Sequence, residues 1–234
     1  ALENYQTLRH DNGQPGNIYW VRPWQLVTDP LFFDNENNTC SKDINGKWVC
    51  TDLRKDICQG ELNDCWFLAT LGNLSCFQDV MSRVIPEGQN FDPKNGYKGK
   101  FYFYFYYYGD WIQIVVDDLI PVIVYPNGMH RFYGCSSESP NEFWSALIEK
   151  AYAKFQGGYH MMKYGNSNQA MMDFTGGIAE QREIKNEIEK RDDKDYSIFF
   201  RQIKKAINNK SLVNACIVAN SMDEMEARGQ EPGL

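Results

Sequence analysis

One cysteine occupies a position where a protein chain can make a thiol reactive. Cys65 directly follows Asn63 and Asp64, residue types that often cap a helix, and apolar residues then recur at helical spacing through Leu74. The sequence therefore predicts that Cys65 lies in the first turn of a mostly buried helix. There, unpaired N–H groups and the positive end of the helix dipole favour a thiolate over a thiol. Considered alone, a cysteine at a helix start is more commonly a buried structural residue.

An amide donor precedes this cysteine by six residues. The side chain of Gln59 is long enough to reach back toward the helix start, where the backbone N–H of Cys65 also points. Two such donors stabilise the oxyanion that forms when a nucleophile attacks a carbonyl carbon. We therefore expect Cys65 to be a nucleophile and Gln59 to be an oxyanion donor.

Composition excludes several other classes of function. The 234 residues have 43% hydrophobic and 24% charged content, which is ordinary for a globular protein. The chain carries 24 basic and 31 acidic residues and no Lys/Arg-rich run, so nucleic-acid binding is not expected. No apolar run approaches the ~18 residues of a transmembrane helix. The seven cysteines form no regular framework and favour a reduced, cytoplasmic protein, although Cys40 and Cys50 flank an Asn45–Gly46 hairpin signal and could bridge if oxidised.

Local patterns predict a mixture of helices and strands. Pro23 suits the first turn of a short helix running toward Leu26, and a longer helix is expected from Asn141 to its end at Gly157. Residues 101–108 and 111–116 are apolar and aromatic and flank Gly109-Asp110, which indicates a hairpin with a half-buried sheet rather than a stacking platform for bases. The remaining expectations are a linker at 165–168, an amphipathic helix around 196–207 and a strand-like run over 212–219.

Several short motifs, taken in their order along the chain, resemble those of the calpain family of calcium-dependent, papain-like cysteine proteases. They are Trp-x-Arg-Pro (20–23), Gln-Gly-x-Leu-x-Asp-Cys-Trp (59–66), Val-Val-Asp-Asp-Leu-Ile-Pro (115–121), Asn-Glu-Phe-Trp-Ser (141–145), Glu-Lys-Ala-Tyr (149–152) and Asp-Phe-Thr-Gly-Gly (173–177). One departure is Asn63, where calpains usually carry glycine. Asparagine tolerates left-handed backbone better than most residues, so the turn is compatible with it.

The resemblance implies an α+β, papain-like protease core. Residues 1–164 are then expected to form the first lobe, which carries the nucleophile, and residues 165–234 to begin the second lobe. Calcium is the implied cofactor, held by the side chains of Asp56 and Glu142 and by the backbone carbonyls of Val49 and Thr51. Without the resemblance these two acids would be interpreted as exposed carboxylates. Arg54 matches a calpain arginine that links the two lobes in the active state.

The general base of such a protease is not evident in the sequence. A papain-type site needs an imidazole beside the thiolate and an amide that orients the ring. The three histidines, His10, His130 and His160, lie outside the Gly-His-Ala-Tyr context that carries the calpain base, and no Asn-Pro-Trp-Gly word is present. By the resemblance, the chain ends shortly before that histidine, and we expect it to be an inactive fragment.

The resemblance implies an intracellular calcium-dependent endopeptidase that acts on protein substrates. Its partners would be the remainder of the protease core and further regulatory domains or a subunit. The alternative is a non-catalytic calpain-fold module that binds calcium or another protein. Retention of both Gln59 and Cys65 favours the protease. The presence of the histidine and asparagine motifs downstream would distinguish the protease from the non-catalytic module.

Overall fold

The fold is an α+β arrangement in a computed structural model. It describes residues 17–34, 40–42, 48–50, 53–126, 129–163, 165–183 and 196–216. The chain divides into two compact units, Ala1–Gln181 and Arg182–Leu234. The expected division of a protease core at residue 164 remains a prediction.

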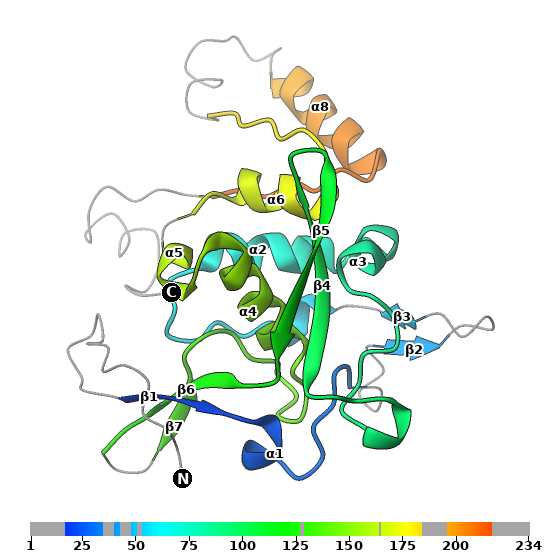
Figure 1. The fold of residues 1–234 in the computed structure, drawn as a ribbon. Helices are drawn as coiled ribbons and strands as arrows, with labels where there is room; N and C mark the ends of the chain where they lie inside the picture. Colours follow the sequence, from blue (N-terminus) through cyan, green and yellow to red (C-terminus); the bar gives the residue numbers. More distant parts are fainter. Residues whose placement is uncertain are drawn as a thin grey trace. The chain divides into compact units, whose positions relative to one another are not determined.

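Short antiparallel strands and short helices make up the first unit (Figure 1). Its three sheets have the orders β1-β6-β7, β2-β3 and β4-β5. The strands are β1 Asn17–Val21, β2 Cys40–Lys42, β3 Trp48–Cys50, β4 Lys100–Tyr107, β5 Asp110–Asp117, β6 Ile120–Val124 and β7 His130–Phe132. The helices are α1 Pro23–Leu26, α2 Cys65–Leu74, α3 Gln78–Val84, α4 Trp144–Gln156, α5 Tyr159–Met162 and α6 Ser167–Thr175, with 3₁₀ turns η1 Leu53–Asp56 and η2 Pro93–Asn95.

The aromatic hairpin forms one wall of the core. Alternate residues of β4 point inward, so Phe101, Phe103 and Phe105 are fully buried while the tyrosines between them are half-buried. In Figure 1 the hairpin runs past α4 and α6, and both helices contact it. Ring stacking continues the core toward the predicted nucleophile helix, since Phe67 of α2 lies 4.8 Å from Tyr152 of α4, centroid to centroid. The hairpin and its half-buried character are confirmed.

The hairpin turn is one residue earlier than predicted. Its two central residues are Tyr108 and Gly109, with φ of 46° and 101°. Two positive φ values match the twist of the flanking strands in a tight hairpin. Pairing of Tyr107 with Asp110 fixes this register.

The helix expected from Asn141 begins instead at Trp144, with Phe143 as its N-cap. The preceding residues are engaged with another segment, because Leu31 N donates to Asn141 O at 2.7 Å and Phe143 N donates to Leu31 O at 3.0 Å. Gly157 ends the helix in left-handed conformation, as predicted.

The expected linker at 165–168 is wrong, because helix α6 begins within it. Asn166 is the N-cap, and its side chain accepts a hydrogen bond from Asn168 N at 2.8 Å. Asparagine is both a loop former and a good N-cap, and the sequence did not distinguish these roles.

In the second unit, α8 spans Tyr196–Asn208, in agreement with the predicted amphipathic helix. The strand-like run does not form a strand over 212–216, its described part. Among the described residues, no strand pairs with this segment, so no β-sheet forms there. Residues 217–219 lie outside the described part.

The hairpin expected around Asn45 and Gly46 is present as strands β2 and β3, in which Cys40 is paired with Cys50. Its turn lies outside the described residues.

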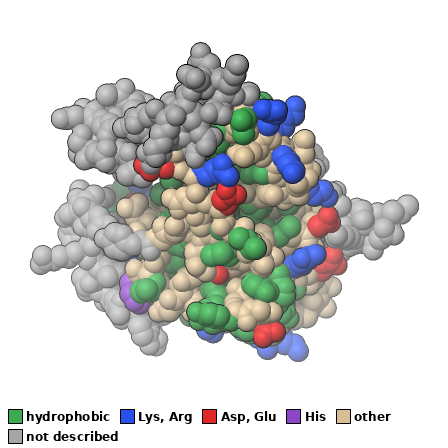
Figure 2. All heavy atoms as spheres, turned by 90° about the horizontal axis from the view of Figure 1, so that it is seen from above, with side chains coloured by type: hydrophobic (Ala, Val, Ile, Leu, Met, Phe, Trp, Pro, Cys, Tyr) green, Lys and Arg blue, Asp and Glu red, His purple; other side chains and the backbone are tan. Residues whose placement is uncertain are grey.

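Acidic and basic side chains are interspersed on the face shown in Figure 2, with apolar side chains between them. The described helices include none with the length and hydropathy of a membrane span.

Candidate active site

Helix α2 begins at the predicted nucleophile. Cys65 is its first residue and Asp64 its N-cap, and the carbonyl of Asp64 accepts the N–H groups of Phe67 at 2.8 Å and Leu68 at 3.2 Å. Behind the start, Phe67, Leu68, Leu71 and Leu74 are buried. The Cys65 thiol is free and exposed. A thiol at this position is accessible to a large substrate and sits at the positive end of the helix dipole.

The loop before the helix is held against a second backbone segment. Tyr133 O accepts hydrogen bonds from Glu61 N at 3.0 Å and from Leu62 N at 2.8 Å. Gly60 allows this close approach, because a Cβ at that position would lie 1.9 Å from Gly134 O. The residues that connect Gln59 to Cys65 therefore have a fixed path.

Gln59 lies exposed at the head of this loop. Its Nε2 donates to Leu62 O at 3.2 Å. An amide nitrogen carries two N–H groups, so one is used by this bond and the second remains available to another acceptor. The bond thus orients the side-chain amide within the loop that carries Cys65.

The backbone of Asn63 does not adopt the left-handed conformation that the sequence analysis considered for this position. The described non-glycine residues with positive φ are Tyr108 and Lys210. Replacement of the usual calpain glycine by asparagine therefore adds no backbone strain at this position.

Trp66 ties the start of α2 to the segment after α5. Its indole Nε1 donates to Met162 O at 2.8 Å, and its carbonyl accepts from Ser167 Oγ at 3.0 Å. Gly165 packs against the indole so closely that a Cβ there would lie 2.0 Å from the ring. The helix start is therefore braced by residues about a hundred positions away in the sequence.

The two described histidines are exposed and form no hydrogen bond or ion pair with Cys65. His130 lies in β7 and His160 in α5. His10 lies outside the described residues. Among the described residues, no imidazole is therefore hydrogen-bonded to the thiol as a base.

The acids expected to bind calcium are both buried and lie near one another. Asp56 ends η1 and is 8% exposed, and Glu142 precedes α4 and is 3% exposed. Glu142 accepts hydrogen bonds from Asp34 N at 2.6 Å and from Trp144 Nε1 at 3.1 Å. Burial, together with the smaller effect of the neighbouring Asp56 carboxylate, raises the pKa of Glu142 to about 7. Two buried carboxylates that repel each other suit a cation with oxygen ligands.

Asp34 belongs to the same neighbourhood and was not predicted from the sequence. It is 7% exposed, and its carboxylate accepts a hydrogen bond from Ser139 Oγ at 2.7 Å. The residues that follow it, 35–38, are all polar, so the sequence pattern gave no signal for burial of Asp34.

The remaining expected positions are described only in part. Val49 lies in β3 opposite Ser41, whereas Thr51 lies outside the described residues. Arg54 lies in η1, and its side chain passes close to Gly72 of α2. In the part of the chain that the structure describes, no three His, Cys, Asp or Glu side chains form a metal-binding group.

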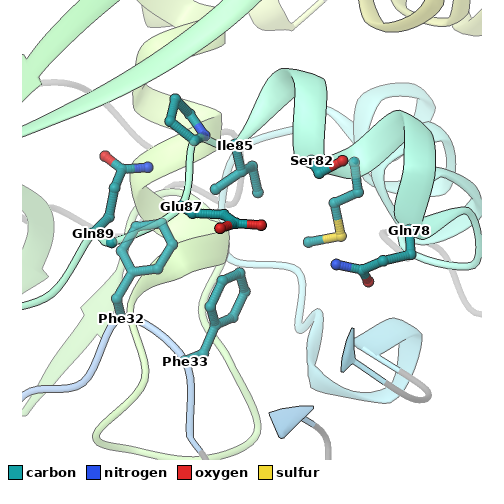
Figure 3. Close-up of a pocket in the computed structure, with 10 residues that line it drawn as sticks. Phe32, Phe33, Gln78, Ser82, Ile85, Glu87 and Gln89 are labelled. Atoms are coloured by element: carbon teal, nitrogen blue, oxygen red, sulfur yellow. The ribbon is translucent and has the colours of Figure 1, made fainter. Parts of the chain in front are cut away.

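A separate pocket lies between the 31–33 segment, α3 and the loop that follows α3. Phe32, Phe33, Ile85, Glu87 and Gln89 are among the side chains that line it (Figure 3). It contains neither Gln59 nor Cys65, so it is distinct from the candidate active site.

Comparison with known proteins decides the family. The model of the calpain family cysteine protease matches residues 3–233. The chain belongs to this family. Among its relatives, human calpain-1 catalytic subunit is 36% identical over 223 residues, human calpain-9 is 39% identical over 209 and human calpain-12 is 38% identical over 177.

These alignments cover most of this calpain chain and a small part of each relative. They include 95%, 89% and 75% of the chain, but only 27%, 26% and 21% of the relatives' own lengths. The chain thus spans about a quarter of the length of the curated relatives it matches. The α+β fold is consistent with the calpain catalytic domain.

Proposed function

We propose that the chain carries the nucleophile of a calpain-type cysteine endopeptidase acting on protein substrates. The observation that supports this most strongly is the free, exposed Cys65 thiol at the start of α2. Its thiolate attacks the carbonyl carbon of a peptide bond. The Cys65 N–H and the second N–H of Gln59 hold the resulting oxyanion. The carbon–nitrogen bond then breaks, and an acyl thioester forms on the sulfur while the amine departs with a proton.

The proton transfer requires a base that the described part does not provide. A histidine and an asparagine beyond this chain are proposed for it, in the second lobe that begins at residue 165. The chain on its own is therefore proposed to be inactive. Its partner is the remainder of the core, with further regulatory domains or a subunit, and the proposed location is cytoplasmic.

Calcium is the proposed cofactor in the first lobe. Asp56 and Glu142 would hold it through their carboxylates, and Val49 and Thr51 through their carbonyls. The chemistry it would supply is neutralisation of the two acids and ordering of the segments that carry them. Arg54, which follows Thr51 by three residues, is proposed to contact the second lobe in the ordered state.

The experiment compares calcium-stimulated hydrolysis of a protein substrate by this chain and by the chain followed by the remainder of a calpain core. We expect no turnover by the first and turnover by the second. Asp56→Asn in the longer protein should raise the calcium concentration for half activity at least about tenfold, since a side-chain ligand is weakened. Asp110→Asn, an exposed acid of the hairpin turn, is the matched control and should leave it unchanged. If Asp56→Asn and Asp110→Asn needed the same calcium concentration for half activity, Asp56 would not be a calcium ligand.

The absence of a described imidazole beside Cys65 favours the second candidate, a non-catalytic calpain-fold module. A longer protein that binds calcium and a protein partner but shows no turnover would identify the module. Turnover by the 234-residue chain itself would show that one of its own histidines serves as the base.

A further inference from the structure

Asp64 has a buried carboxyl group that helix capping does not explain. Its side chain is 1% exposed and makes no capping hydrogen bond to α2. Neither carboxyl oxygen accepts a hydrogen bond of normal geometry from the residues that the structure describes. The group beside it is the carboxyl of Glu149.

Glu149 is equally buried and projects from α4. It is 1% exposed, and its Oε1 accepts a hydrogen bond from Cys135 N at 2.8 Å. Gly134 makes room for it, because a Cβ there would lie 1.7 Å from Glu149 Oε2. The carboxyl therefore rests directly on the backbone of residues 134 and 135.

That backbone is the support of the candidate active-site loop. The carbonyl of the preceding residue, Tyr133, accepts the N–H groups of Glu61 and Leu62. The backbone of Gly134 lies against Gly60. Contacts thus lead from Glu149, through residues 133–135, to the loop between Gln59 and Cys65.

The surroundings of the two carboxyls contain acidic and neutral groups. The Cys135 thiol lies beside Glu149 and near Ser145 Oγ. Burial raises the pKa of the Tyr159 phenol in α5, which lies close enough to both carboxyls, and to Tyr133, for their charges to raise it as well. Among the charged groups, Glu61 of the loop is paired with the exposed Arg131, and the ammonium of Lys150 is bound to Asp117. Burial raises the pKa of both carboxyls, and the two also act on one another. Two buried, adjacent carboxylates cannot both be charged without a large cost, so one proton is retained between them.

We propose that Asp64 and Glu149 share one proton and together act as positioning residues for the Gln59–Cys65 loop. In the shared state, one carboxyl donates to the other, while Glu149 accepts from Cys135 N. Loss of the proton places two negative charges in a buried space and separates the carboxyls, which releases the support of the loop. The catalytic meaning of this loop rests on the proposed function, whereas the pair and its test do not.

The test is amide hydrogen exchange in the 234-residue chain, measured from pH 6 to pH 9 and corrected for intrinsic exchange. In the wild type, protection of the Glu61, Leu62 and Cys135 amides should fall with rising pH, by up to about tenfold per pH unit once the pair loses its proton. In Glu149→Gln, a permanent amide donor faces Asp64 and protection should stay constant. The amide of Phe103, in the core of β4, is the internal reference and should not change in either protein.

Two further measurements keep the result interpretable. Infrared spectra at pH 7 should show a protonated carboxylic acid band that is weaker in Glu149→Gln than in the wild type. Glu149→Ala should lower protection of the loop amides at every pH, and if it does not fold, the comparison of wild type with Glu149→Gln still decides. Equal pH dependence in these two proteins, or no change in the infrared band, would overturn the proposal. Absence of peptidase activity in the longer protein, with pH-dependent protection intact in this chain, would contradict the proposed function alone.

Discussion

Two exposed thiols flank helix α2, one near each end. Cys65 is the first residue of the helix, and Cys76 follows its C-terminal residue by two positions. The first sits at the positive end of the dipole, whereas the second sits at the negative end and donates its thiol to Gly72 O at 3.6 Å. The two thiols therefore lie at opposite ends of the same helix dipole.

Alkylation by iodoacetamide near pH 7 should consequently be faster at Cys65 than at Cys76. The dipole contributes ~0.3–1 kcal/mol at each end, so the rates should differ by roughly 3–30-fold. Peptide mapping of the modified residues provides the measurement, and the buried Cys135, whose pKa is raised by burial, serves as the protected reference. A Cys65 rate that stays constant down to pH 5 would reveal an ion pair with a histidine of this chain.

The loop between Gln59 and Cys65 and the backbone that supports it contain glycines at close contacts. Gly60 and Gly134 lie at such contacts, whereas Gly72, inside α2, has no neighbour closer than 3.8 Å to an added Cβ. A side chain therefore does not fit at Gly60 or Gly134 but does fit at Gly72, a difference that the sequence alone does not show.

Alanine substitutions separate these roles. Gly60→Ala should reduce the free energy of unfolding by roughly 1–3 kcal/mol, because the methyl group collides with the Gly134 carbonyl. Gly72→Ala should instead increase it by roughly 0.5–1 kcal/mol, since alanine is the better helix former. Urea denaturation measures both. Equal effects of the two substitutions would contradict the described contact between residues 60 and 134.

Local patterns predicted the elements whose signals lie within a few residues. Helix α2 with its cap at Asp64, the 100–117 hairpin and the stop at Gly157 follow from such signals. The start of α4 did not, because pairing with Leu31 determines it. The Asp64–Glu149 pair was missed for a similar reason, since its members are far apart in the chain. A glutamate within the apolar run of α4 was the one available sign.

At the scale of the whole molecule, the calpain family is established. The stability of the chain itself, however, should show the buried acids. Folding raises the pKa of Asp64 and Glu149, so the folded chain binds more protons than the unfolded chain above about pH 4. Their contribution is therefore present at low pH and is lost as pH rises through about 6 and above.

Urea denaturation from pH 5 to pH 8 should show this loss. The free energy of unfolding should decrease by up to about 1.4 kcal/mol per pH unit for each proton retained on folding. Other carboxylates, such as Asp117 with its lowered pKa, also contribute, so the informative quantity is the difference between the wild type and Glu149→Gln. As pH rises, the free energy of unfolding of the wild type should fall relative to that of Glu149→Gln. A difference independent of pH would mean that the pair is fully ionised in the folded chain.

The most direct measurement is substrate turnover by three forms of the longer protein, in which this chain is followed by the remainder of a calpain core. The wild type should hydrolyse a protein substrate in the presence of calcium. Cys65→Ser should lower kcat at least roughly a thousandfold, because the nucleophile is removed, while Cys76→Ser, at the other end of the same helix, should leave it within about twofold. Turnover retained by Cys65→Ser, or lost equally in both variants, would contradict the assignment of Cys65 as the nucleophile.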